Sequence, residues 1–288
     1  MKKIVYFLKN FILYAIIFAN ISGCSKAFGK NGSGSAPAAS FRAENTAANP
    51  ELEKLNSVLS SMSKRFKATF SIPAGEEGIF LDDLRKVLES EKDFSSGDIS
   101  PFFLVDKKNF LPENYVPKNM IPLKKNDLYA ITKNTLSLRK EAYDALNRLA
   151  AAAKAGGVTL TIGSTYRSYE YQKNLFDYWV RIDGLEEAER ESSRPGTSQH
   201  QLGLVLDFAP IEDEFAETGA GKWAAENAAK YGWSLSFPNG YEDVTGYRWE
   251  SWHFRYVGLP AVMFQEKYFG NVQQFMLEFI NAWKSLEN

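Results

Sequence analysis

The segment SQHQLGLVLDF, at residues 198–208, joins a polar start that contains a histidine to an apolar run that contains an aspartate. Residues 202–208 predict a short buried β-strand, because the run is brief, apolar and preceded by polar residues. Asp207 lies inside this run. Burying a carboxylate is costly unless a cation or strong hydrogen-bond donors compensate its charge. The segment therefore predicts a core strand with a partner for Asp207.

A second segment, ESWHF at residues 250–254, contains His253, and the chain has only 2 histidines. Two neutral imidazoles and one carboxylate form a common catalytic zinc site that leaves one position open for water. A carboxylate nearby, such as Glu250, can accept the proton of that water. The plainer alternative is that each histidine packs in the core and that Asp207 is a turn residue. Composition alone leaves both interpretations open.

The spacing of these residues restricts how they could meet. His200 and Asp207 are seven positions apart, and Glu250 and His253 are three apart. Odd separations place two side chains on opposite faces of one flat strand. If the four converge, His200 must lie in the loop before its strand, and Glu250 in a turn or bulge before His253. Gly203 is placed where the chain could bend or approach closely.

The remaining pattern indicates a mixture of helices and strands. Three prolines between residues 109 and 123 argue for an extended connection there. Ser168 is a candidate N-cap for the helix that follows it. The periodicity predicts helices at residues 51–69, 81–90, 138–155, 169–180, near 222–231 (ending at Gly232) and 272–286. It predicts strands at residues 102–105, 158–162, 202–208, 233–237 and 252–257.

The first residues resemble an export signal. Three lysines flank an apolar run at residues 11–18, which is shorter than the about 20 residues that span a bilayer. The sequence ISGC at residues 21–24 resembles the lipobox of bacterial lipoproteins, in which the cysteine is acylated. An uncleaved anchor helix, or a plain signal with an incidental cysteine, are the alternatives. Cys24 is the only cysteine, so no intramolecular disulfide can form.

These features predict an organisation in four parts. Residues 1–23 are a lipoprotein signal peptide, and residues 24–50, rich in Gly, Ser, Ala and Asn, are a flexible tether. Residues 51–100 are a small helical extension, and residues 101–288 are the catalytic domain. The mature protein is expected to be exported and lipid-anchored at a bacterial membrane, facing the periplasm or cell wall.

The overall charge excludes one class of partner. Lysine and arginine total 34, and aspartate and glutamate total 35, for a formal net charge of -1. A nucleic-acid-binding domain normally carries a clear excess of basic residues. No nucleic-acid partner is therefore expected.

The motif Ser-x-His-x-x-Gly-x-x-x-Asp at residues 198–207, followed by Glu-x-Trp-His at residues 250–253, resembles a known family. It is similar to the zinc D-alanyl-D-alanine carboxypeptidases of the vancomycin-resistance type and to their L,D-carboxypeptidase relatives. The resemblance runs in ordered blocks over residues 101–270 and extends to STYRSYEYQ at 164–172, PGTS at 195–198, TGY at 245–247 and WHFRYVG at 252–258. One departure is Val205, where the family usually has a small residue.

This resemblance implies an α+β fold of the Hedgehog/DD-peptidase type, with a small antiparallel sheet that carries the zinc site and helices around it. It implies that His200, Asp207 and His253 bind Zn²⁺. It also implies that Glu250 is the general base that deprotonates a metal-activated water.

Three further residues acquire expected roles from the resemblance. Arg167 would neutralise the developing oxyanion or the terminal carboxylate of the substrate. Gln172 and Ser198 would help to bind the peptide, although ordinary capping or surface polarity explains them as well.

The implied reaction is removal of a terminal D-alanine from peptidoglycan stem peptides, with D,D- or L,D-specificity. An endopeptidase with the same metal centre is one alternative. A non-catalytic wall-binding lipoprotein on a degenerate peptidase fold is the other, and it would be favoured if a ligand or the base were missing. None of them is missing from the sequence.

Overall fold

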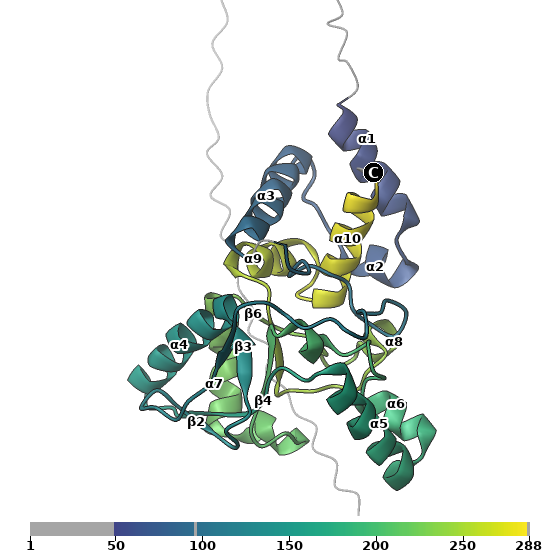
Figure 1. The fold of residues 1–288 in the computed structure, drawn as a ribbon. Helices are drawn as coiled ribbons and strands as arrows, with labels where there is room; N and C mark the ends of the chain where they lie inside the picture. The colour runs from purple at the N-terminus through teal and green to yellow at the C-terminus, as the bar shows by residue number, and fades with distance from the viewer. Residues whose placement is uncertain (1–48, 95–96, 287–288) are drawn as a thin grey trace, which may run out of the picture. The chain divides into compact units, whose positions relative to one another are not determined.

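The computed structural model describes residues 49–94 and 97–286 (Figure 1). The expected signal peptide, almost all of the expected tether and Cys24 lie outside the described residues. Among the described helices, none combines the length and the apolarity that crossing a membrane requires.

A five-stranded sheet lies at the centre of the fold, and its strand order is β2-β4-β5-β7-β6. Its strands are β2 (Tyr129–Ile131), β4 (Leu160–Ser164), β5 (Val205–Phe208), β6 (Trp233–Leu235) and β7 (His253–Tyr256). In the order β4-β5-β7-β6, neighbouring strands pair antiparallel, as expected, but β2 pairs parallel with β4. The parallel pair arises because a helix connects these two strands, and such a crossover returns the chain in the same direction. The expected α+β class is confirmed.

Helix α4 (Lys140–Ala155) connects the sheet's edge to β4 and covers one side of it (Figure 1). Its buried face is made of four alanines and two leucines, and the small alanines allow close approach to neighbouring strands. Before it, β1 (Met120–Pro122) and β3 (Ser137–Arg139) form a separate two-stranded sheet. Near the opposite edge, α7 (Gly219–Asn227) and the 3₁₀ turn η4 (Ala228–Tyr231) end at Gly232, as expected, where φ is +81°.

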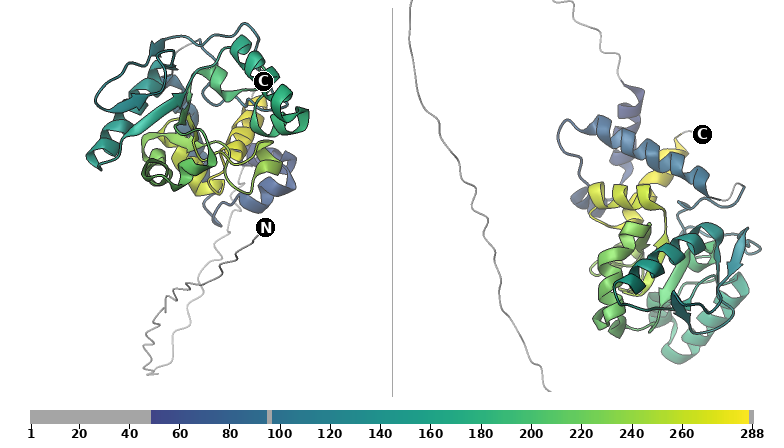
Figure 2. Two further views of the ribbon diagram at one scale, coloured as in Figure 1. Left: turned by 90° about the horizontal axis from the view of Figure 1, so that it is seen from below. Right: turned by 90° about the vertical axis from the view of Figure 1, so that its left-hand side faces the viewer.

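A second hydrophobic core joins the two ends of the described chain. Helices α1 (Pro50–Ser61), α2 (Lys64–Thr69) and α3 (Glu77–Ser90) pack against α9 (Leu259–Tyr268) and α10 (Gln273–Ser285). Figure 2 shows the purple and the yellow helices side by side from two further directions. Aromatic rings dominate the contacts, for example Phe80 with Phe264 and Phe70 with Phe269, whose centroids are 5.1 and 5.2 Å apart.

Two expected elements differ from the structure. The helix expected at residues 51–69 is broken at Met62, and Ser63 caps α2 by accepting a hydrogen bond from Phe66 N at 3.1 Å. The strand expected at residues 102–105 is not a strand. Its surrounding backbone is held by a side chain instead, because Arg255 Nη2 donates to the carbonyls of Pro101 and Phe103 at 2.7 and 2.9 Å.

Several short elements were not expected from periodicity, because each is brief or has no one-sided apolar stripe. Helix α5 (Tyr169–Asp183) begins at the expected N-cap, Ser168, and continues into α6 (Leu185–Glu191), which was not predicted. The other elements that were not expected are α9, β1, β2, β3, η1 (Glu91–Asp93), η2 (Gln199–Leu202), η3 (Asp213–Glu217) and α8 (Glu242–Thr245).

Candidate metal centre

The antiparallel pairing of β5 and β7 brings Asp207 directly opposite His253. His200 reaches the same place from η2, the turn before β5, as the odd spacing required. Gly203 ends η2 with φ +69°, a left-handed conformation that reverses the chain into the strand. Glu250 lies in the segment before β7, also as expected. The register between β5 and β7, together with the tight turn η2, therefore brings the four side chains together.

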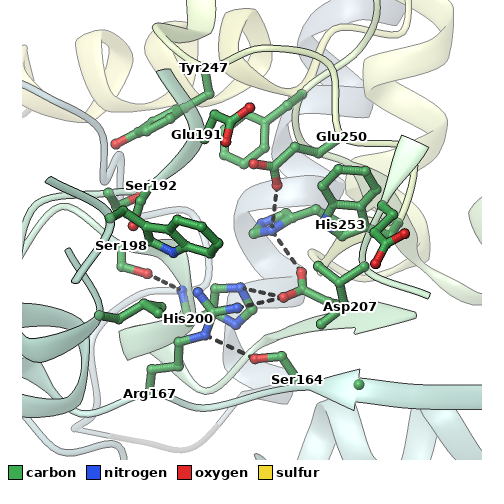
Figure 3. Close-up of a pocket in the computed structure, with 18 of the residues that line it drawn as sticks. Ser164, Arg167, Glu191, Ser192, Ser198, His200, Asp207, Tyr247, Glu250 and His253 are labelled. Carbon is green, nitrogen blue, oxygen red and sulfur yellow. Dashed lines mark hydrogen bonds and ion pairs between the residues drawn. The ribbon is translucent and has the colours of Figure 1, made fainter. Parts of the chain in front are cut away.

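The atoms of His200, Asp207 and His253 that could bind a metal ion lie close together in the lining of a cavity (Figure 3). His200 Nε2 lies 3.2 Å from Asp207 Oδ2, and His253 Nδ1 lies 3.0 Å from Asp207 Oδ1. Glu250 Oε2 lies 3.4 Å from His253 Nδ1. One atom from each of His200, Asp207 and His253 lies within 4.8 Å of the others, and all three residues are buried.

The other nitrogen of each imidazole is held by the protein. His200 Nδ1 lies 2.7 Å from the carbonyl oxygen of Thr165, which can only accept, so Nδ1 carries the proton. His253 Nε2 lies 3.4 Å from Gln199 Oε1, which also accepts from Ser236 Oγ at 2.7 Å. These contacts leave the lone pairs of His200 Nε2 and His253 Nδ1 directed at Asp207.

The buried carboxylate provides a test of whether a metal ion fits. Asp207 Oδ1 has no hydrogen-bond partner among the described residues, although His253 Nδ1 is close to it. Two imidazole lone pairs and a carboxylate that face one another in a buried site need a cation between them. Two nitrogens and one oxygen are a ligand set that Zn²⁺ accepts. The residues present therefore fit a zinc ion.

The pKa values of the side chains in this cluster are strongly shifted. Burial raises the pKa of Asp207, but Arg167, together with His200 and His253 when they are protonated, outweighs burial and holds that pKa well below its usual range. Burial, with Arg167 nearby, lowers the pKa of His200 to about 4. His200 is therefore neutral at pH 7, as a metal ligand must be. Burial and the charge of Asp207 raise the pKa of Glu250 to about 8, which suits a group that exchanges protons.

Arg167 and Ser198 lie in the wall of the same cavity. Arg167 donates from Nη2 to Asp207 Oδ2 at 2.7 Å and from Nε to Ser164 Oγ at 2.9 Å. Ser198 caps η2, where its Oγ accepts from His200 N at 3.3 Å. Both residues therefore also position the ligands.

Gln172 lies elsewhere, contrary to the expectation that it would contact the peptide. It is on the buried face of α5, and its Nε2 donates to Ser193 O at 2.8 Å and to Ser192 Oγ at 3.3 Å. It is not among the residues that line the cavity. Its position supports the wall segment Ser192–Ser193, which does line the cavity.

The cavity has a volume of about 580 Å³, larger than the metal cluster alone requires. Its wall includes Tyr247, Arg248 and Trp252, for which sequence reasoning gave no role. Arg248 is held by Glu191 at 2.8 Å and by Asp213 at 2.6 Å, which joins separate segments of the wall. The only sequence signal for Gln199 was its place beside His200 in the opening motif.

Comparisons with known proteins show which family the chain resembles. The family model described as "VanY: D-alanyl-D-alanine carboxypeptidase" matches residues 135–259, a range that contains all four residues of the cluster. YodJ of Bacillus subtilis (strain 168), provisionally named a carboxypeptidase, is 36% identical over 191 residues, which are 64% of this chain and 69% of that protein.

A D-alanyl-D-alanine carboxypeptidase of Enterococcus faecium is 31% identical over 190 residues, covering 64% of this chain and 59% of that protein. Among solved structures, the LdcB L,D-carboxypeptidase is 34% identical with a TM-score of 0.53. That match covers 62% of this chain and 85% of LdcB.

Proposed function

The chain belongs to the VanY family of D-alanyl-D-alanine carboxypeptidases, and we propose that it removes a terminal D-alanine from peptidoglycan stem peptides in a zinc-dependent reaction. The observation that carries the proposal is the convergence of His200, Asp207 and His253 below Glu250 in one cavity. The alternative of a non-catalytic binding protein has no support from this site, since neither a ligand nor a base is missing.

The zinc ion would be held by His200 Nε2, His253 Nδ1 and the Asp207 carboxylate. When bound, Zn²⁺ supplies an acidified water molecule and polarises the scissile carbonyl. Thr165 and Gln199 orient both imidazoles, so His200 Nε2 and His253 Nδ1 stay directed at the proposed metal position.

Glu250 would accept the proton of the attacking water and pass it to the leaving amine. Its carboxylate is next to His253, and burial raises its pKa, so the ionised carboxylate is a stronger base than that of an exposed glutamate. Among the described residues, Glu250 and Asp207 are the carboxylates within 4.0 Å of a ring nitrogen of His200 or His253.

Arg167 would stabilise negative charge in the cavity. Its Nη2 is paired with Asp207 and its Nε with Ser164, so Nη1 is left without a hydrogen-bond partner among the described residues. That atom can donate to an oxyanion or to the terminal carboxylate of a peptide. Ser198 lies in the same wall and would contact the same end of the peptide.

The proposal includes both D,D- and L,D-cleavage. One relative is named for D,D-cleavage and another for L,D-cleavage, at 31% and 34% identity. Both specificities, and an endopeptidase that uses the same centre, are compatible with a cavity of about 580 Å³. The sequence of residues 1–50 supports a further proposal, that a lipid on Cys24 holds the exported protein at a bacterial membrane.

The direct test uses defined stems. The protein is incubated with tetrapeptide and pentapeptide stems, with and without a chelator, and the products are identified by mass spectrometry. Release of D-alanine only without chelator is the expected result, and the substrate that is shortened gives the specificity. Release that persists after complete removal of metal, or no release from any stem, would exclude the proposed reaction.

A further inference from the structure

Helix α5 has an apolar face that the fold does not bury. Only two of its residues are buried, Gln172 and Phe176. A second stripe repeats at intervals of three and four residues, which places its members on one face. The stripe consists of Tyr171, Leu175, Tyr178, Trp179 and Ile182. The charged residues Lys173, Asp177 and Arg181 lie on the opposite side of the helix, so the stripe is a distinct surface.

This stripe is continuous with the metal cavity. Tyr171, Leu175 and Trp179 line the same cavity as His200 and Glu250. The helix begins two residues after Arg167, whose guanidinium binds the ligand Asp207. The stripe therefore starts beside the metal ligands and leads away from them along α5.

The far part of the stripe is exposed. Tyr178 and Ile182 do not line the cavity, and they are 45% and 60% exposed. The ring of Tyr178 meets that of Trp179 edge to face, with centroids 5.2 Å apart. Contiguous exposed apolar surface that continues a ligand cavity indicates a binding surface.

The charge of the surroundings indicates what the surface binds. Residues 169–191, which form α5 and α6, contain seven acidic and three basic side chains. This excess repels an anionic lipid surface, which attracts basic segments instead. A neutral occupant is favoured. The C–H faces of a sugar ring are weakly positive, and they stack well on the electron-rich faces of Tyr and Trp rings.

We propose that the exposed aromatic face of α5 binds a neutral sugar ring of the glycan chain to which the stem peptide is attached. This rests on the proposed function, which places the end of the stem at the metal. The distances agree. Four extended residues span at most ~14 Å, and the far, exposed part of the stripe begins at Tyr178, ~10 Å along the helix from Tyr171. A sugar at the start of the stem therefore reaches the exposed end of the stripe.

The test compares two substrates that share one stem. The full-length chain with zinc is given either the free pentapeptide or the same peptide carried on its disaccharide. We expect KM to be about fivefold lower for the disaccharide-linked stem, as one stacked ring would provide. The double variant Tyr178→Ala/Ile182→Ala should lose this difference, with kcat and the KM for the free peptide unchanged.

Met263→Ala is the matched control, because Met263 is also an apolar side chain that is 60% exposed, on α9 rather than α5. It should keep the wild-type difference in KM. Circular dichroism and Tm measurements check that each variant is folded.

A second readout does not need hydrolysis. The peptide-free disaccharide, titrated against the protein and followed by NMR, should shift tryptophan indole signals in the wild type but not in the double variant. If neither stem is hydrolysed while the sugar still binds at α5, the proposed function fails and this inference stands.

Three outcomes would overturn the inference. Equal KM values for both substrates in the wild type would show that the sugar makes no contact. An equal rise in KM for both substrates in the double variant would show that the stripe binds peptide. Binding to phosphatidylcholine vesicles that the double variant loses would assign the surface to a membrane.

Discussion

Gln199 Oε1 lies 3.4 Å from His253 Nε2, although the two residues are 54 positions apart in the sequence. Gln199 directly precedes the other histidine of the cluster, so one short turn positions both imidazoles. It binds no metal itself, yet it determines which nitrogen of His253 faces Asp207.

Replacing Gln199 should weaken zinc binding without removing a ligand. Gln199→Leu deletes the acceptor for His253 Nε2 and leaves Ser236 with its second acceptor, Gln273 Oε1, at 3.3 Å. Loss of such a supporting contact typically lowers metal affinity about 10- to 100-fold. Competition with a chelating dye measures the change. Gln199→Glu keeps an acceptor and should bind zinc at least as tightly as Gln199→Leu does. Unchanged affinity in Gln199→Leu would show that the contact is unimportant.

Glu250→Gln should separate metal binding from catalysis. The variant keeps the size and burial of the side chain but cannot accept a proton, so kcat should fall by about 10² or more. Metal analysis should still find zinc, because the three ligands are intact. Glu278→Gln is the control, since Glu278 is another carboxyl group whose pKa is raised by burial, but it lies on α10 outside the cavity. A fully active Glu250→Gln protein would rule out the assigned base.

Gly203→Ala should both destabilise the protein and disturb the metal site. A Cβ at this position would meet Met120 Sδ at 3.0 Å and Arg139 Cγ at 3.2 Å, and the φ of +69° disfavours any other residue. Strain and overpacking together should cost roughly 2–4 kcal/mol. Gly240→Ala is the matched control, because Gly240 has φ +82° but open space around its Cβ position. It should cost only about 1–2 kcal/mol. Equal losses of Tm in the two variants would contradict the predicted clash.

Asp83 should make stability depend on pH. Burial alone would raise its pKa, but hydrogen bonds from Lys86, Lys267 and Tyr268 lower it to about 2, against an ordinary value of 3.8. Because the folded pKa is the lower one, the stabilisation is fully present above pH 3.8 and is lost as the pH falls through about 2.

Asp83→Asn should therefore lower Tm at pH 7 and have little effect near pH 2. The group is partly exposed to solvent, so the effect at pH 7 should be about 1 kcal/mol or less. Asp82→Asn is a suitable comparison, because Asp82 is bonded to Arg85 within α3 and to no other described residue. If Asp83→Asn lowers Tm equally at both pH values, the ionised carboxylate is not the cause.

The sequence predicted the four residues of the cluster but not the residues that hold them in position. The apolar run before Asp207 indicated β5, and the odd spacing of the four residues correctly required turns at His200 and Glu250. Gln199 was missed because a glutamine next to a histidine carries no periodic signal, and its contact depends on β6 and β7 lying nearby. Gln172 was misplaced because its helical position shows which face it occupies but not what covers that face.

Contacts between residues distant in the sequence also explain where the structure differs from the predicted elements. An apolar run such as residues 102–105 has the composition of a strand, but here the buried Arg255 binds the neighbouring carbonyls and prevents strand pairing. Periodicity predicted helices where α1 and α3 lie, although it did not predict their bounds. It could not show that their partners were α9 and α10, because periodicity carries no information about contacts distant in the chain.

The joint core of the first and last helices has a consequence for biosynthesis. Asp83 and Lys267, which form an ion pair across it, are separated by 184 positions. Helices α1–α3 leave the ribosome well before α9 and α10, which provide the surface that covers their aromatic side chains. Those side chains therefore stay uncovered until α9 and α10 have been made, and this favours chaperone binding and cooperative folding of the two groups of helices.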